Sequence, residues 1–112
     1  MNRVLLICAL LAAAGLPVPS VAGQILIYGF GDESCGKWQE AMKEDSVHRL
    51  QLNQWVLGFL SGYNWTSSLR NGPQARPVDI PAAIGYMDGY CMANPLKTIA
   101  SGALSLVHET TK

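Results

Sequence analysis

The sequence predicts a small all-α protein, a bundle of about four helices with a short extended N-terminal arm. Three observations support this. Apolar residues recur at spacings of three and four, as on one face of a helix. Helix-capping residues precede most of these stretches. Cys35 and Cys91 fall on the apolar faces of two different predicted helices, which indicates a disulfide that staples the bundle.

Residues 1–22 have the features of a secretory signal peptide rather than of a folded segment. Arg3 is followed by a nearly unbroken apolar run over 4–16, and Pro17-Val18-Pro19 interrupts it. Ser20-Val21-Ala22 then supplies the small residues that a signal peptidase recognises, and the run is short for a membrane helix. We therefore expect cleavage after Ala22, a single domain over residues 23–112, and a periplasmic or secreted location.

Residues 23–28 begin the domain as an extended arm or a lone strand, too short to build a sheet, and we expect them to pack on the helices. A first helix should run to about Lys43, capped by Asp32 or Ser34. It places Cys35, Trp38 and Met42 on one face.

A second helix is predicted over residues 47–69, capped by Asp45 or Ser46. Its main apolar stripe consists of Leu52, Val56, Phe59 and Tyr63, widened by Trp55 and Leu60. Gly58 and Gly62 lie beside the stripe. Glycine costs about 1 kcal/mol against alanine within a helix, so we expect them to admit another backbone at close range. Trp65 lies off the stripe and is the best candidate for an exposed contact residue, and we predict a partner-contact surface at Gly58, Gly62 and Trp65.

Residues 71–77 contain Asn-Gly and two prolines and should form a loop. Asp79 then caps a third helix with Pro81 in its first turn. Its predicted core face carries Ile80, Ile84, Met87 and Cys91. Gly85 and Gly89 lie on the opposite side of this helix.

Asn94-Pro95 should end the third helix and start a fourth, with Asn94 as the N-cap. The apolar stripe of the fourth helix is expected to comprise Leu96, Ala100, Ala103 and Val107.

Cys8 leaves with the signal peptide, so Cys35 and Cys91 can form only one intramolecular disulfide in an oxidising compartment. A metal site or a reactive thiol is the competing interpretation. Neither cysteine has a second Cys or a His at ligand spacing, which favours the disulfide.

Composition excludes several classes of function. Only 14% of the residues are charged, and the net charge falls from 0 to about −1 when Arg3 is removed with the signal peptide. The chain therefore offers no basic field for nucleic acid, and we expect no membrane insertion of the mature domain. A thinly charged surface favours exposed apolar area that a protein partner covers.

No pattern predicts a catalytic, cofactor-binding or metal site. His48 and His108 lie near the ends of separate helices and are expected to have no catalytic role. Asp88 lies at the edge of the third apolar face, where a solvated or hydrogen-bonded carboxylate is favoured over one with a perturbed pKa. We therefore predict a protein that is not an enzyme.

The pattern resembles the HdeA/HdeB family of small exported helical proteins with one disulfide. The resemblance rests on the signal peptide, a cysteine opening the first helix, Trp55-x-x-Gly58-Phe59-x-x-Gly62, and Tyr90-Cys91-x-x-Asn94-Pro95. It implies a periplasmic acid-stress chaperone, a dimer near neutral pH that loosens in acid and holds unfolded client proteins.

A second resemblance, to small periplasmic immunity proteins of type VI secretion, rests on Leu57-Gly58-Phe59-Leu60-x-Gly62 and the downstream Cys91. It implies one cognate toxin as the partner. Those proteins typically carry another cysteine just before the glycine-aromatic segment, where this chain has Val56.

Overall fold

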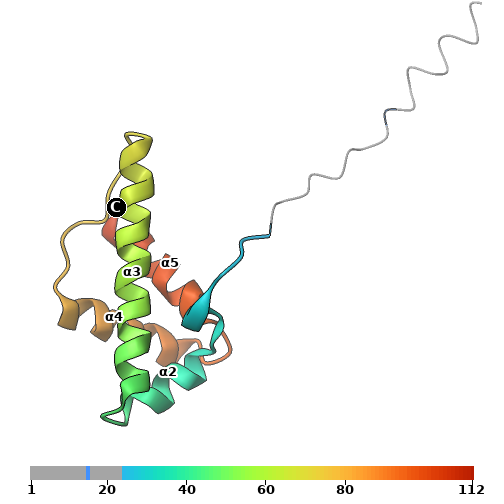
Figure 1. Cartoon of the computed structure of the whole chain (residues 1–112), viewed down its shortest axis with the longest axis vertical. Coiled ribbons are helices and arrows are strands. Elements are labelled where there is room, and N and C mark those ends of the chain that lie inside the picture. Colours follow the sequence, from blue (N-terminus) through green and yellow to red (C-terminus); the bar gives the residue numbers. More distant parts are fainter. Residues whose placement is uncertain (1–14, 16–23) are drawn as a thin grey trace, which may run out of the picture.

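The computed structural model describes residue 15 and residues 24–112. Apart from Gly15, the predicted signal peptide lies outside the described residues. The described part contains a short 3-10 turn and four α-helices, which confirms the predicted all-α fold (Figure 1). They are η1 (Gly29–Asp32), α2 (Cys35–Met42), α3 (Val47–Leu69), α4 (Ile80–Ala93) and α5 (Ile99–Thr110).

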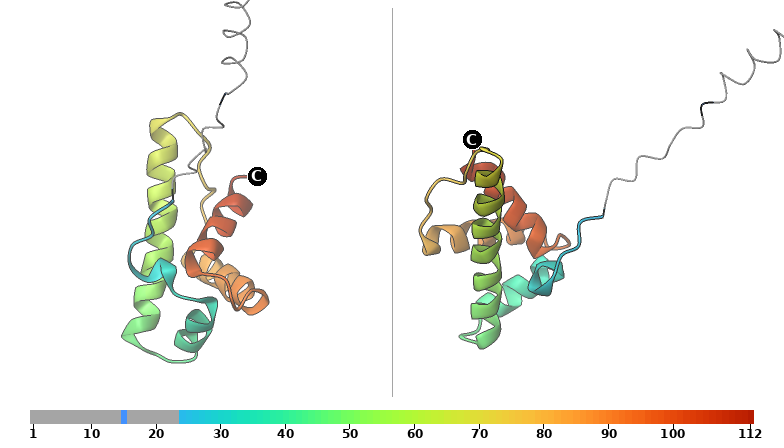
Figure 2. Two further views of the ribbon diagram at one scale, coloured as in Figure 1. Left: turned by 90° about the vertical axis from the view of Figure 1, so that its right-hand side faces the viewer. Right: turned by 45° about the horizontal axis from the view of Figure 1, so that its top comes forward.

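Helix α3 is the long element beside which the others are arranged. Figure 2 (left view) shows α2, α4 and α5 on one side of α3. Its fully buried residues, Leu52 and Val56, both lie in its first half. These two residues belong to a core to which all four helices contribute. The largest fully buried side chains of this core are Trp38, Leu52, Met87 and Ile99. The second half of α3 therefore contributes less to the core than the predicted stripe implied.

Each α-helix begins at a residue whose side-chain oxygen accepts a hydrogen bond from a backbone N–H three positions later. This contact satisfies one of the donors that a helix start leaves free. The four caps are Ser34, Ser46, Asp79 and Thr98. Three of them were among the predicted capping residues, and the boundaries of α3 agree with the prediction.

The start of the last helix differs from the prediction. Asn94 is the C-cap of α4, and α5 begins at Ile99, so Pro95 and Leu96 lie in a turn. The cause is a backbone pairing with the start of α2. The Cys35 N–H donates to the Lys97 carbonyl, and the Ile99 N–H donates to the Glu33 carbonyl. An extended segment is needed for these bonds, and Leu96 is consequently 96% exposed instead of in the core.

The core face of α4 is also shifted from the predicted one. Met87 and Cys91 are buried as expected, but Ile80 is 56% exposed and Ala83 takes the buried position in the first turn. Cys35 and Cys91 form the predicted disulfide, with their Cα atoms 4.7 Å apart. Both cysteines are fully buried. The bond therefore joins the start of α2 to the end of α4 within the core.

The N-terminal arm packs on the helices only at its end. Residues 24–28 are extended without forming a strand. The Trp55 indole N–H donates to the Tyr28 carbonyl at 2.7 Å. Gly31 is buried under the same ring, and a Cβ there would overlap the indole of Trp55. Ile25, Leu26 and Tyr28 remain exposed, so the predicted packing of the arm is wrong for most of its length.

Candidate protein-binding surface

Gly58, Gly62 and Trp65 lie on a face of α3 that no other described element covers. Their spacing of four and three residues places them on one side of the helix. A Cβ added to either glycine would meet nothing within 4 Å. The expected close approach of another backbone within the fold is therefore wrong, because this side of α3 is open. We call these three residues, together with Leu69 one turn further on, the glycine face.

The glycine face is apolar and uncharged. Trp65 and Leu69 are each 72% exposed. No residue between Arg49 and Arg70 carries a charge, so the whole exposed side of α3 lacks the solvated ions that usually cover an outward helix face. The two glycines make one end of the face flat, and Trp65 and Leu69 project from the other end. A large aromatic side chain beside a flat apolar surface is a common arrangement at protein interfaces.

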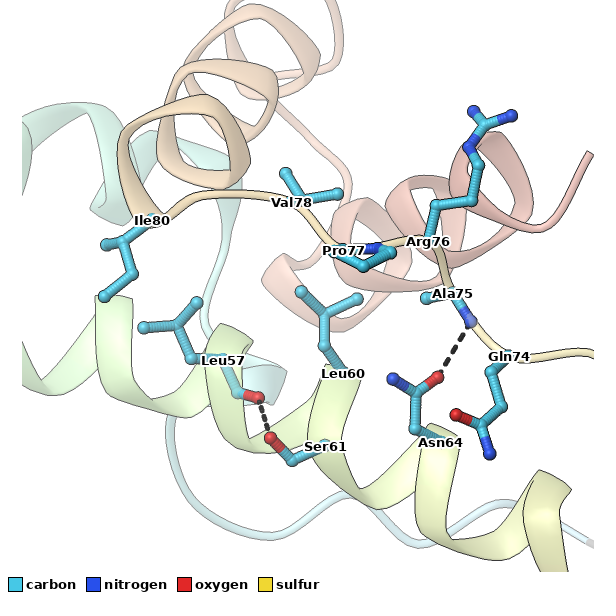
Figure 3. Close-up of a pocket in the computed structure, with 10 residues that line it drawn as sticks. All are labelled: Leu57, Leu60, Ser61, Asn64, Gln74, Ala75, Arg76, Pro77, Val78 and Ile80. Atoms are coloured by element: carbon cyan, nitrogen blue, oxygen red, sulfur yellow. Dashed lines mark hydrogen bonds between the residues drawn. The ribbon is translucent and has the colours of Figure 1, made fainter.

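A groove lies on a neighbouring face of α3, between this helix and the extended segment that leads into α4 (Figure 3). Its volume is about 680 Å³. The lining residues are Leu57, Leu60, Ser61, Asn64, Gln74, Ala75, Arg76, Pro77, Val78 and Ile80. We call this feature the α3 groove. The groove was not predicted from the sequence. The proline-containing connection between α3 and α4 was a signal for it, because such an extended segment has to run back along α3.

Specific contacts at one end of the α3 groove fix its width. The Ala75 N–H donates to the Asn64 side-chain oxygen at 2.8 Å, and the Arg76 N–H donates to the Thr110 carbonyl of α5 at 2.9 Å. The Arg76 side chain points away from α3 (Figure 3), and its guanidinium donates to the carbonyls of Glu109 and Lys112. The charged end of Arg76 is therefore directed away from α3, although this residue lines the groove.

His48 has a partner that its sequence position did not predict. Its Nε2 lies 3.1 Å from the Glu33 carboxylate, within ion-pair distance although not aligned for a hydrogen bond. The Phe30 ring meets the imidazole edge to face, with ring centroids 5.4 Å apart. These contacts join η1 and the segment before α2 to the first turn of α3. His108 is exposed near the end of α5.

Asp88 is hydrogen-bonded, as the sequence analysis favoured. Its carboxylate accepts from the indole N–H of the fully buried Trp38 at 2.8 Å, which joins α4 to α2. At the other end of the molecule, a hydrogen bond from Lys112 holds the pKa of Glu109 below its ordinary value. A carboxylate with a lowered pKa stabilises the fold above its unfolded-state pKa, and this stabilisation is lost as the pH falls through the folded-state value.

Within residues 24–112, two features that would indicate other classes of function are absent. No three His, Cys, Asp or Glu side chains gather closely enough there to hold a metal ion. None of the helices in that range combines the length and hydropathy needed to cross a bilayer. The predicted absence of catalytic, cofactor and metal sites stays a prediction. No protein-family model, curated protein or solved structure matches the chain.

Proposed function

We propose that this chain is a non-enzymatic, exported protein-binding protein, which acts as an acid-stress chaperone of the HdeA/HdeB type. The glycine face is the observation on which the proposal rests. Gly58 and Gly62 leave one end of the face flat, and Trp65 provides an exposed aromatic anchor next to them. Because the surrounding helix surface is uncharged, apolar segments of an unfolded client can dock without leaving an unpaired charge buried.

Acid is the proposed trigger for exposing further apolar surface. The contribution of Glu109 has the required sign, since its lowered pKa stabilises the fold near neutral pH and not in strong acid. Its carboxylate is exposed and makes a small contribution by itself.

An aggregation assay tests the chaperone proposal. An enzyme that unfolds and aggregates at pH 3 is mixed with the exported, signal-processed protein, and light scattering is followed together with the fluorescence of a dye that binds apolar surface. We expect the dye signal to rise below pH 4 and scattering to fall as the protein is added in excess. If neither signal changes between pH 7 and pH 2, the chaperone proposal is wrong.

A matched pair of variants assigns the activity to the glycine face. Gly58→Glu places a charged side chain on that face, and Gly85→Glu makes the same change at an open helical glycine of α4. We expect Gly58→Glu to lose most of the protection against aggregation and Gly85→Glu to retain it. Equal activity of the two variants would contradict a role for this face, provided that circular dichroism shows both to be folded.

Binding to one folded toxin is the alternative function, as in type VI immunity proteins. The flatness of the glycine face favours it, since a preformed surface with a single aromatic anchor suits a partner of fixed shape. Native mass spectrometry of material recovered by pull-down at pH 7 and pH 3 separates the alternatives. One stoichiometric partner at pH 7, lost in Gly58→Glu, supports the immunity function. Many partners, bound only at pH 3, support the chaperone function.

A further inference from the structure

The N-terminal arm carries apolar side chains that no described part of the same chain covers. Ile25 is 83% exposed and Leu26 is 73% exposed. Residues 24–28 are extended and contain no charged side chain. Two adjacent aliphatic residues exposed on an extended segment are suited to insertion into a groove, because an extended chain directs them to opposite walls.

The α3 groove is complementary to the apolar arm, because most of its lining side chains are apolar. Leu57, Leu60, Val78 and Ile80 give it apolar walls. The guanidinium of Arg76 is held by the backbone carbonyls of Glu109 in α5 and of Lys112 just after this helix. The stretch of α3 from Leu57 to Asn64 is roughly 10 Å long at 1.5 Å per residue. The uncharged segment 24–26 is about the same length when extended, at roughly 3.3 Å per residue.

The arm of a chain cannot fill the groove of the same chain in this fold. Trp55, which binds the Tyr28 carbonyl, projects from the side of α3 opposite to Leu57, two residues later. Figure 1 shows the arm on the right of α3 and the segment that bounds the groove on the left, and the right-hand view of Figure 2 shows the same arrangement. The three residues before the anchored Tyr28 span roughly 10 Å when extended. This length is too short to pass around a helix that is about 10 Å in diameter.

We propose that the α3 groove binds the N-terminal arm of a second copy of this chain, with Ile25 and Leu26 as the inserted residues. Reciprocal exchange of arms fills both grooves and closes a two-fold dimer. The proposal does not depend on the proposed function, because the groove and the glycine face are different faces of α3. The two proposals can fail separately. A chaperone that is active without arm exchange contradicts only the exchange of arms. Arm exchange in a protein without chaperone activity contradicts only the proposed function.

Mass measurement in solution is the first test. The full chain is expressed with export and purified, and its mass is measured by light scattering after size-exclusion chromatography over a range of concentrations at pH 7. We expect a dimer that Leu26→Asp on the arm and Ile80→Lys on the exposed groove wall each weaken by at least about tenfold, because each places a charge in the apolar contact. Leu96→Asp and Leu96→Lys are the controls, since Leu96 is 96% exposed in the turn before α5, and they should leave the dimer unchanged.

Cross-linking between copies tests the contact itself. Protein with Leu26→Cys is mixed with protein with Ile80→Cys under mild oxidation, and intact mass identifies the products. We expect a disulfide that joins one copy of each variant, and much less of the corresponding product from Leu26→Cys with Leu96→Cys. A wild-type protein that is monomeric at every concentration overturns the proposal. A dimer that neither Leu26→Asp nor Ile80→Lys weakens also overturns it, as does equal cross-linking to positions 80 and 96.

Discussion

Glycines of this chain have opposite structural roles that depend on what surrounds the missing side chain. Gly31 lies under the Trp55 ring, where a Cβ has no room. Gly29, with a φ of +73°, has a backbone conformation that other residues rarely adopt. At Gly58 and Gly62 a Cβ meets nothing within 4 Å, so neither packing within the chain nor backbone conformation requires glycine there.

We expect Gly58→Ala and Gly62→Ala each to stabilise the fold by about 0.5–1 kcal/mol, because alanine restricts the unfolded chain and favours a helix. Gly31→Ala should be destabilising, because Trp55 must move. Chemical denaturation with circular dichroism measures all three. A loss of stability in Gly58→Ala, without a change in oligomeric state, would show that the helix face is already covered within the monomer.

At the scale of the elements, α2 and α5 begin side by side, and this pairing decides where α5 starts. Thr98 caps the helix by accepting a hydrogen bond from the Ser101 N–H at 3.2 Å. An isolated antiparallel bridge joins Thr98 to Ser34, which is itself the cap of α2. The two helix starts therefore share one small network of backbone and side-chain hydrogen bonds.

Removal of the cap should show which residue starts the last helix. We expect Thr98→Ala to lower the free energy of unfolding by about 1 kcal/mol, the usual cost of losing a capping oxygen. Thr98→Ser retains a hydroxyl oxygen and should recover most of the loss. Thermal unfolding of the two variants provides the comparison, and equal stability of Thr98→Ala and the wild type would contradict this assignment.

The sequence was sufficient to predict those elements whose signals are local. Ser46, Asp79 and the apolar spacing placed α3 and α4 because capping and periodicity act within a few residues. Asn94-Pro95 was misleading as the start of α5, since the segment 97–99 is held extended by residues 33–35, which are remote in sequence. The α3 groove depends in the same way on contacts between segments, such as that of Asn64 with Ala75.

At the scale of the whole molecule, one covalent bond joins helices that are distant in sequence. The disulfide between Cys35 and Cys91 has a sequence separation of 56, and both cysteines are fully buried. A cross-link of this loop length restricts the unfolded chain and stabilises the fold by about 4 kcal/mol in the chain-entropy model. That is a large share of the 5–15 kcal/mol by which proteins are usually stable.

We expect the double variant Cys35→Ala, Cys91→Ala to lose about 4 kcal/mol of stability relative to the oxidised protein. Denaturant titration of the oxidised wild type and the double variant measures the loss. A separate comparison with the reduced wild type distinguishes the effect of the cross-link from that of truncating two buried side chains. A loss well below 1 kcal/mol would mean that the helices are held together without the bond.

The pairing of residues 33–35 with 97–99 also determines the order of events during folding. A chain that emerges N-terminus first presents Glu33 and Cys35 long before Lys97, Ile99 and the second cysteine. Until the C-terminal segment arrives, the start of α2 lacks its backbone partners, and the Cys35 thiol lacks Cys91, to which it is bonded in the fold. Local helices can form early, but the core closes only after nearly the whole chain is available. We therefore expect the Cys35 thiol to react with thiol reagents before folding is complete and to be protected in the fold, where this residue is fully buried.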